Sequence, residues 1–191
     1  NNLTYSQDAG QRSSSPEKYT LRTYDGLNRQ LTLSEETPND PNIEEDSPTS
    51  GNVFTVNCYD SLAYDPVGSI FSNVPSDYNS VINNTKGAIV ATAYRTLLTD
   101  GWSYKFYRYD ARGRVTRFWH YIYGLGWKSE NYYYNSQNQV IRNWYQPNLS
   151  DGKVFTYSYD DAARLIKTNL YLGSQPGDPE EETDTPSAYL L

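Results

Sequence analysis

Residues 107–119 read YRYDARGRVTRFW, and this stretch decides the fold. An alternating aromatic run ends at Tyr109-Asp110, a turn-like Ala-Arg-Gly follows, and a second alternating run begins at Val115. Alternation of this kind is typical of a half-buried β-strand. Asp110 can hydrogen-bond backbone two residues on, and Gly113 tolerates the left-handed conformation that a tight hairpin needs. The stretch therefore predicts a β-hairpin.

The same pattern recurs along the chain. Counted on the tyrosine of the Tyr-Asp core, Tyr109, Tyr134 and Tyr159 are separated by 25 residues each time, and another copy surrounds Tyr24. Self-similarity at a fixed period indicates a stack of similar units, each of which buries its face against the next. The aligned segments are 18–33, 104–119, 130–144 and 153–171, with a degenerate copy at 56–71.

We interpret the residues of the repeat core as structural. The Asp or Asn closes the turn, the Arg pairs locally, and the Tyr packs on the sheet. An active site is not usually built four times over, so recurrence argues for architecture. At the left-handed position Ala163 fits less well than Gly or Asn, so we expect that turn to differ. The core residues are Tyr24, Asp25, Arg29, Tyr109, Asp110, Gly113, Arg114, Tyr134, Asn135, Tyr159, Asp160 and Arg164.

Composition excludes several classes of protein. Only 37% of the 191 residues are apolar, yet 20 are tyrosine, which suits strands that are half buried and half wet. A net charge of −7 without a Lys- or Arg-dense run argues against nucleic-acid binding. The sequence contains no run of about 18 apolar residues, so it predicts no membrane-spanning helix. The single cysteine, Cys58, is expected to be buried, and the single histidine, His120, has no partners for a zinc site or a triad. We therefore expect no metal and no cofactor.

Two acidic, proline-rich loops, 34–51 and 173–187, divide the chain. We predict an opening hairpin plus acidic loop at 1–51, a β-sheet region at 52–172, and an acidic linker with the start of a further strand at 173–191. Between copies we expect loops at 120–127 and 146–152, and the pattern of 86–98 favours a strand. Five carboxylates of the second acidic loop lack the spacing of a calcium loop: Asp178, Glu180, Glu181, Glu182 and Asp184.

The pattern Tyr-Asp-x-x-Gly-Arg-apolar resembles the YD repeat of RHS proteins, a repeat that teneurins also use. Residues 109–115 have every signature position, whereas the other copies keep parts of it. Residues 84–110 also resemble a segment that precedes YD repeats in RHS-like proteins of the Bacteroidetes type. The resemblance covers 18–33 and 84–172 well and 52–83 loosely.

The resemblance implies successive antiparallel hairpins joined into a curved or spiralling sheet that forms a hollow shell. Such shells enclose a C-terminal toxin or present adhesive surfaces. Four or five hairpins are too few to close a shell, and an open ribbon leaves strand edges unpaired. We therefore expect a fragment of a larger polypeptide, or a subunit whose edges pair with identical copies.

We predict a non-enzymatic structural segment of a shell or surface fibre, secreted and located outside the cell or on its surface. Its partners would be further YD repeats, identical subunits, glycans or an enclosed C-terminal effector. One rival hypothesis is a self-assembling filament subunit joined by strand pairing. The other is a carbohydrate-binding adhesin that stacks sugars on exposed Trp119, Trp127 and Trp144.

Overall fold

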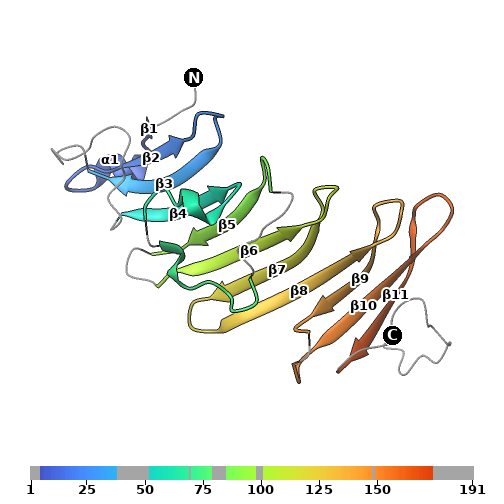
Figure 1. The fold of residues 1–191 in the computed structure, drawn as a ribbon. Helices are drawn as coiled ribbons and strands as arrows, with labels where there is room; N and C mark the ends of the chain where they lie inside the picture. The colour runs from blue at the N-terminus through green and yellow to red at the C-terminus, as the bar shows by residue number, and fades with distance from the viewer. Residues whose placement is uncertain are drawn as a thin grey trace.

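The computed structural model describes residues 5–37, 52–68, 70–78, 85–97, 101–147 and 149–173. Within these ranges, eleven strands form one antiparallel sheet in which each strand pairs with its neighbours in sequence, from β1 to β11 (Figure 1). The predicted all-β fold of successive antiparallel hairpins is confirmed. The segments expected at 1–51 and 52–172 share this sheet, because β3 pairs with β4.

The bounds of the elements follow the repeat. The strands are β1 (Tyr5–Ser6), β2 (Tyr19–Tyr24), β3 (Gln30–Glu36), β4 (Val53–Tyr59), β5 (Ile89–Tyr94), β6 (Ser103–Tyr109), β7 (Val115–Ile122), β8 (Gly126–Tyr134), β9 (Val140–Tyr145), β10 (Lys153–Tyr159) and β11 (Leu165–Leu172). The short helical turns are α1 (Ala9–Ser13), η1 (Leu62–Tyr64) and η2 (Ile70–Ser72). The strand expected within 86–98 is present as β5.

The sheet twists along its length, from the blue β1 at one end to the red β11 at the other (Figure 1). Twisting follows from the steric preferences of L-residues, which rotate neighbouring strands relative to one another. The four copies of the repeat form the hairpins β2–β3, β6–β7, β8–β9 and β10–β11. In each one the register shifts by a residue just before the core tyrosine.

The loop expected at 120–127 is wrong in its extent. β7 continues to Ile122, β8 starts at Gly126, and these two residues pair directly. Gly124 and Gly126 both have a φ of 80°, which lets the chain reverse within a tight turn. Tyr121 and Trp127 belong to the paired strands, whereas Tyr123 lies in the turn.

Only the first half of the degenerate copy expected at 56–71 has the structure of the other copies. Tyr59 ends β4 and pairs with Ile89 after the same register shift that precedes the other core tyrosines. The second strand is β5, so an insertion at 60–88 replaces the tight turn. Within the insertion, both carboxylate oxygens of Asp65 accept backbone N–H groups, at 3.0 Å from Val67 and 3.0 Å from Ile70.

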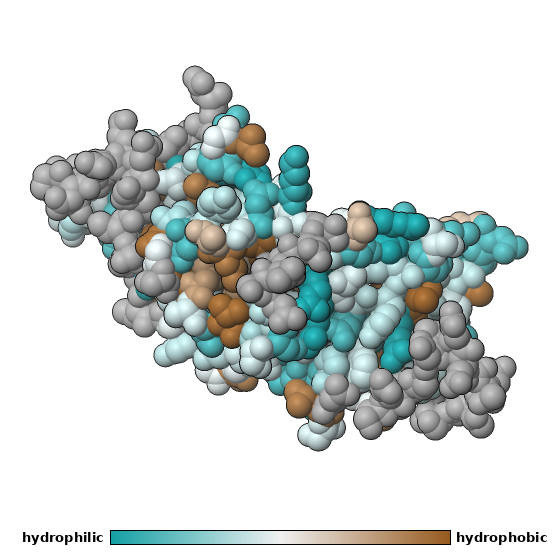
Figure 2. Space-filling view, in the orientation of Figure 1, coloured by the Kyte–Doolittle hydropathy of each residue, from teal (hydrophilic) through white to brown (hydrophobic). Residues whose placement is uncertain are grey.

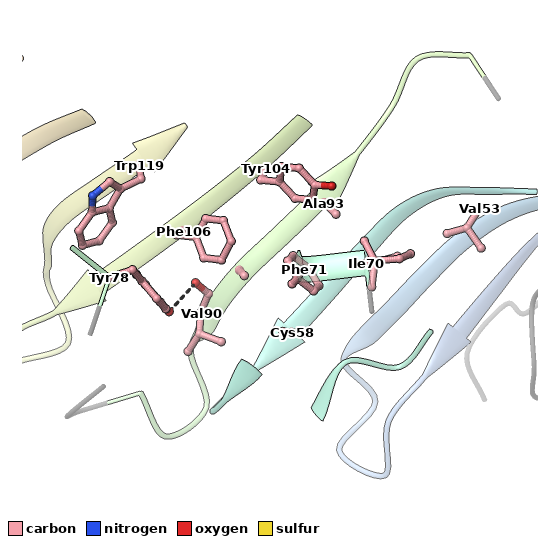
Figure 3. Close-up of a cluster of buried hydrophobic side chains, with 12 residues drawn as sticks. Val53, Cys58, Ile70, Phe71, Tyr78, Val90, Ala93, Tyr104, Phe106 and Trp119 are labelled. Carbon is pink, nitrogen blue, oxygen red and sulfur yellow. Dashed lines mark hydrogen bonds between the residues drawn. The ribbon is translucent and has the colours of Figure 1, made fainter. Parts of the chain in front are cut away.

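The insertion covers part of one face of the sheet. Its side chains Ile70, Phe71 and Tyr78 lie against strands β4 to β7 (Figure 3). Around fully buried Phe106, the ring centroids of Phe71 and Tyr78 lie at 6.0 and 5.0 Å. The buried cluster consists of Val53, Val56, Cys58, Ile70, Phe71, Tyr78, Val90, Ala91, Ala93, Tyr104, Phe106 and Trp119.

Hydrophobic residues gather around β4 and β5 on the visible face, whereas the part over β8 to β11 is largely hydrophilic (Figure 2). The core is therefore localised beneath the insertion rather than spread evenly along the sheet. Cys58 lies in this core, as expected. Burial, and secondarily Asp65, raises the pKa of its thiol to about 12, so it packs as a neutral group.

Replacing Phe106 by Ala should lower the free energy of unfolding by about 3–5 kcal/mol, because a fully buried ring is lost between several other rings. Urea unfolding followed by tryptophan fluorescence measures this loss. Leu125→Ala in the exposed β7–β8 turn is the control and should change stability by less than about 0.5 kcal/mol. Equal effects of the two substitutions would contradict a core centred on Phe106.

Candidate functional site

The repeated turns form the candidate site, and one side-chain oxygen organises each of them. In the second copy Oδ1 of Asp110 accepts the backbone N–H groups of Arg112 at 2.8 Å and Arg114 at 3.0 Å. The same pair of bonds, to the residues two and four positions on, is made by Asp25, Asn135 and Asp160. These four residues therefore lie at the start of a hairpin turn.

The residue three positions after the Asp or Asn is left-handed in all four turns. Asn28, Gly113, Asn138 and Ala163 have φ of 62°, 76°, 66° and 64°. The expectation that the Ala163 turn differs is wrong, because its N–H bonds the Asp160 carbonyl at 2.9 Å as in the other turns. The surrounding bonds hold Ala163 in a conformation that L-residues disfavour.

An arginine closes three of the turns with its side chain. The Nε atoms of Arg29, Arg114 and Arg164 lie 2.6, 2.6 and 2.7 Å from the carboxylates of their own turns. In the third copy both partners are neutral, since Asn135 Nδ2 donates to Gln139 Oε1 at 2.6 Å. The geometry is thus kept whether the pair is charged or neutral.

These hydrogen bonds lower the pKa of the aspartates in the turns. Loss of contact with water raises the pKa of Asp110, but the bonds from Arg114 and the Arg112 amide outweigh it and hold the pKa below its ordinary value. In Asp160 the backbone N–H of Arg164, followed by its guanidinium, lowers the pKa. These carboxylates therefore favour their charged form more strongly in the folded chain than in the unfolded one.

The core tyrosines connect each hairpin to the one before it. The hydroxyls of Tyr109, Tyr134 and Tyr159 donate to backbone carbonyls 19 or 20 residues earlier, at 2.7, 2.7 and 2.8 Å. Burial raises the pKa of Tyr109 and of Tyr134, so these hydroxyls remain protonated donors. The acceptors are the first residues of β5, β7 and β9, and Tyr59 reaches the first residue of β3 at 3.3 Å.

The turn arginines make the reciprocal contact with the next hairpin. The guanidinium of Arg114 lies 4.5 Å from the ring centroid of Tyr134, and its Nη1 lies 3.0 Å from Oδ1 of Asn138. Arg29 likewise lies 4.3 Å from the ring of Tyr59. A cation over an aromatic face is attracted by the ring quadrupole. We call these tyrosine and arginine contacts between successive hairpins the ladder.

Sequence reasoning placed the tyrosines on strands and the arginines in turns but missed the ladder. It also missed Asp60, whose carboxylate accepts from Arg29 at 2.9 Å. The available signal was the 25-residue spacing, which places Tyr134 after Arg114 and Tyr159 after Gln139 at the same distance in sequence. Tyr24 belongs to the first hairpin and ends β2.

The tryptophans expected to be exposed are largely buried. Trp119 and Trp144 are 3% and 5% exposed, so the expectation of a sugar-stacking surface from their faces is wrong. Trp127 is half-buried against the core, 5.9 Å from Phe106 and 5.3 Å from Tyr121 between ring centroids. Trp119 and Trp127 pack on neighbouring rings in the part of the sheet face that the insertion covers.

The lone histidine also has a packing role. Its Nε2 lies 2.6 Å from the hydroxyl of Tyr94, and burial, followed by Lys105, lowers its pKa. Among the described residues no three His, Cys, Asp or Glu side chains are grouped so that they could hold a metal ion. In the same part of the chain, no helix has the length and apolar character needed to cross a membrane. Asp178 and the other carboxylates of the second acidic loop lie outside the described residues.

Comparison with known proteins gives a likeness of fold. No family model matches the chain, and no curated protein matches it. The crystal structure of TcdB2-TccC3 matches with a TM-score of 0.51 and 13% identity over 85% of this chain. The structure of TcdB2-TccC3 without its hypervariable C-terminal region gives 0.49 at 13% identity, covering 83% of this chain and 7% of that one.

The chain spans 7% of the TcdB2-TccC3 chain that it matches. At this identity the likeness shows the fold alone. That fold, a single antiparallel sheet of consecutive hairpins, resembles part of the TcdB2-TccC3 structure.

Two substitutions at the left-handed turn position should change the stability of the chain in opposite directions. Gly113→Ala should destabilise the chain by about 1–2 kcal/mol, because it puts a side chain at a φ of 76°. Ala163→Gly should stabilise it by up to about 1 kcal/mol, because it relieves the same strain. Urea unfolding measures both, and the same sign for both substitutions would rule out a shared turn geometry.

The turn carboxylates should make stability depend on pH. Their folded pKa values are lowered, so their contribution is present above about pH 4 and is lost as the pH falls through the folded values. The double variant Asp110→Asn with Arg114→Gln copies the neutral pair of the third turn. It should lose less stability than the parent chain between about pH 5 and pH 2, as measured by thermal unfolding. An unchanged pH profile would show that the Asp110 pair contributes nothing.

Proposed function

We propose that the chain is a non-enzymatic structural segment of an extracellular RHS-type β-shell or surface fibre. The observation that carries this proposal is the ladder, in which the tyrosine of one hairpin contacts a backbone carbonyl of the hairpin before it and, at Tyr59 and Tyr134, an arginine as well. Such a unit is suited to extension, since every added hairpin repeats one interface. The likeness of fold to TcdB2-TccC3 supports the same role.

The end of the sheet at β11 offers the groups that a further hairpin would use. The side chain of Arg164 is 79% exposed, whereas that of Arg114, which has a hairpin after it, is 23% exposed. Leu165 occupies the position of Val115 and Val140, whose carbonyls accept tyrosine hydroxyls. We infer that the partner of this edge is another YD hairpin, with its tyrosine over Arg164.

The repetition of the candidate site supports a structural role over catalysis. The Asp110–Arg114 and Asp160–Arg164 pairs have the same geometry, and a neutral pair at Asn135 replaces them in one copy. A catalytic acid or base could not be exchanged for an amide without loss of its proton chemistry. An enclosed C-terminal effector remains part of the shell hypothesis.

A filament subunit is the second candidate, and the exposed edge of β11 favours it. Leu165, Ile166 and Leu172 are 54%, 65% and 74% exposed on this strand. An apolar edge strand with unpaired backbone groups is a template for strand addition by another chain. The same edge would then be used between copies instead of within one polypeptide.

Electron microscopy and sedimentation separate the two candidates. The product of the complete gene should appear as a hollow particle with a β-sheet wall, and a compact particle without a cavity would overturn the shell proposal. The 191-residue chain alone should sediment as a monomer if its edge is reserved for its own polypeptide. Fibres that form from it and disappear with Ile166→Lys, which puts a charge on the edge, would establish the filament instead. Lys167→Arg on the same strand is the matched control and should change neither result.

A further inference from the structure

The strands of the last three hairpins end on two opposite sides of the sheet, and these sides differ in polarity. One side carries the repeat turns, in which only Asp, Asn, Gln, Arg, Ser, Ala and Gly occur at 110–114, 135–139 and 160–164. The other side carries the β7–β8 and β9–β10 connections and the end of β11 (Figure 1). On this second side four large side chains are between 52% and 74% exposed, and we call them the apolar rim: Tyr123, Leu125, Leu149 and Leu172.

Backbone hydrogen bonds fix the turns that present two of these leucines. In the β7–β8 turn the N–H of Leu125 donates to the carbonyl of Ile122 at 2.9 Å. In the β9–β10 connection the N–H of Leu149 donates to the carbonyl of Gln146 at 3.2 Å, and its own carbonyl accepts from Gly152 at 2.9 Å. Both turns are therefore ordered before any partner binds, so binding does not have to order them.

The members of the rim are neighbours in the sheet. The N–H of Gln146 donates to the carbonyl of Ser129 at 2.8 Å, so the β9–β10 connection runs beside the start of β8 and its turn. The end of β11 joins from the other side, because the N–H of Gly173 donates to the carbonyl of Gly152 at 3.0 Å. The rim is therefore one surface that extends from β7 to β11.

The shape of the rim favours a soft partner. Single exposed apolar side chains are ordinary on a protein surface, but several adjacent ones mark a site of interaction. These side chains stand at the ends of turns and strands, where they project from the sheet. A rigid protein partner would need matching hollows, whereas a lipid surface adapts to projecting side chains. Tyr123 adds an aromatic ring with a polar end, a residue type enriched where membranes meet water.

Charge selects an anionic surface. Residues 101–173 contain ten Lys or Arg and five Asp or Glu, although the whole chain contains 16 and 23. Lys128 and Lys153 lie next to the rim, as the third residue of β8 and the first of β10. Nζ of Lys128 lies 3.6 Å from Oδ2 of Asp151, whereas no ion pair joins Lys153 to a described carboxylate. A negative surface attracts this half of the sheet and repels the acidic remainder of the chain, so it orients the molecule with the rim toward it.

We propose that the apolar rim docks on an anionic lipid surface, with Leu125, Leu149 and Leu172 below the headgroups and Lys128 and Lys153 beside them. Burial of the leucines removes apolar area from water, and the lysines add an attraction that salt screens. The docking is peripheral, because turn tips reach only the boundary between headgroups and acyl chains. It adds a binding surface to the structural role proposed above and does not depend on that role.

Co-sedimentation of the 191-residue chain with lipid vesicles tests the proposal. Vesicles of phosphatidylcholine with about one-third phosphatidylglycerol should bind the chain more tightly than pure phosphatidylcholine, and salt at about 0.5 M should weaken that binding. Leu125→Ser combined with Leu149→Ser should lower the affinity about ten-fold or more, because two leucines no longer leave water. The matched control is Leu27→Ser, since Leu27 is 73% exposed in the β2–β3 turn on the opposite side, and it should leave the affinity unchanged.

Two further measurements do not depend on the leucine variants. Lys153→Gln should weaken binding to the anionic vesicles several-fold and leave pure phosphatidylcholine unaffected. A polarity-sensitive fluorophore attached at Ser150→Cys, beside the rim, should shift its emission to shorter wavelength when vesicles are added. The same fluorophore at Ser136→Cys, in a repeat turn, should not respond, and the buried Cys58 leaves the introduced thiol as the one that reacts.

Four outcomes overturn the proposal. The parent chain binds neither kind of vesicle, or Leu27→Ser weakens binding as much as the double leucine variant does, or the fluorophore responds equally at both positions. In the fourth, the parent chain does not bind vesicles but sediments as a dimer that the double leucine variant dissociates, which would assign the rim to a second copy of the chain.

Discussion

One oxygen atom in each of the four repeat turns accepts two backbone N–H groups, and this fixes the residue at which the chain reverses. Side chains alternate between the two faces of a strand, so a turn one residue longer would move every apolar side chain to the other face. The register shift before the core tyrosine recurs in the successive hairpins. The tyrosine hydroxyl bonds, the stacking of arginine on tyrosine and the burial of one sheet face all depend on where the chain reverses. Asp110 and its equivalents set that point.

The turns could be predicted because their chemistry is local. Asp110, Gly113 and Arg114 lie within five residues of one another, and their roles follow from side-chain type and backbone freedom. Ala163 shows where local reasoning stops: its preference argues for a different turn, yet the bonds from Asp160 impose the shared one. Tertiary and neighbouring contacts override a preference of this size.

The burial of the aromatic face could not be predicted in the same way. Alternation along a strand says which side chains share a face but not what covers that face. Trp119 is covered by Asp77 and Tyr78, and the sequence separation of 42 residues between Trp119 and Asp77 carries no local signal. The insertion supplies the second layer that a single sheet lacks, and it does so only over the strands near β4 to β7. For this reason Trp119 was expected to be exposed, whereas the hairpins were predicted correctly.

The contacts between hairpins have a direction. Each tyrosine hydroxyl points back to a carbonyl made earlier in the chain, and no hairpin needs a later one to complete its own turn. During synthesis the N-terminal part of a chain emerges first, so every new hairpin meets an acceptor that is already formed. The sheet can therefore be laid down in order as the chain leaves the ribosome, and on its growing side only the most recent strand is open at any time.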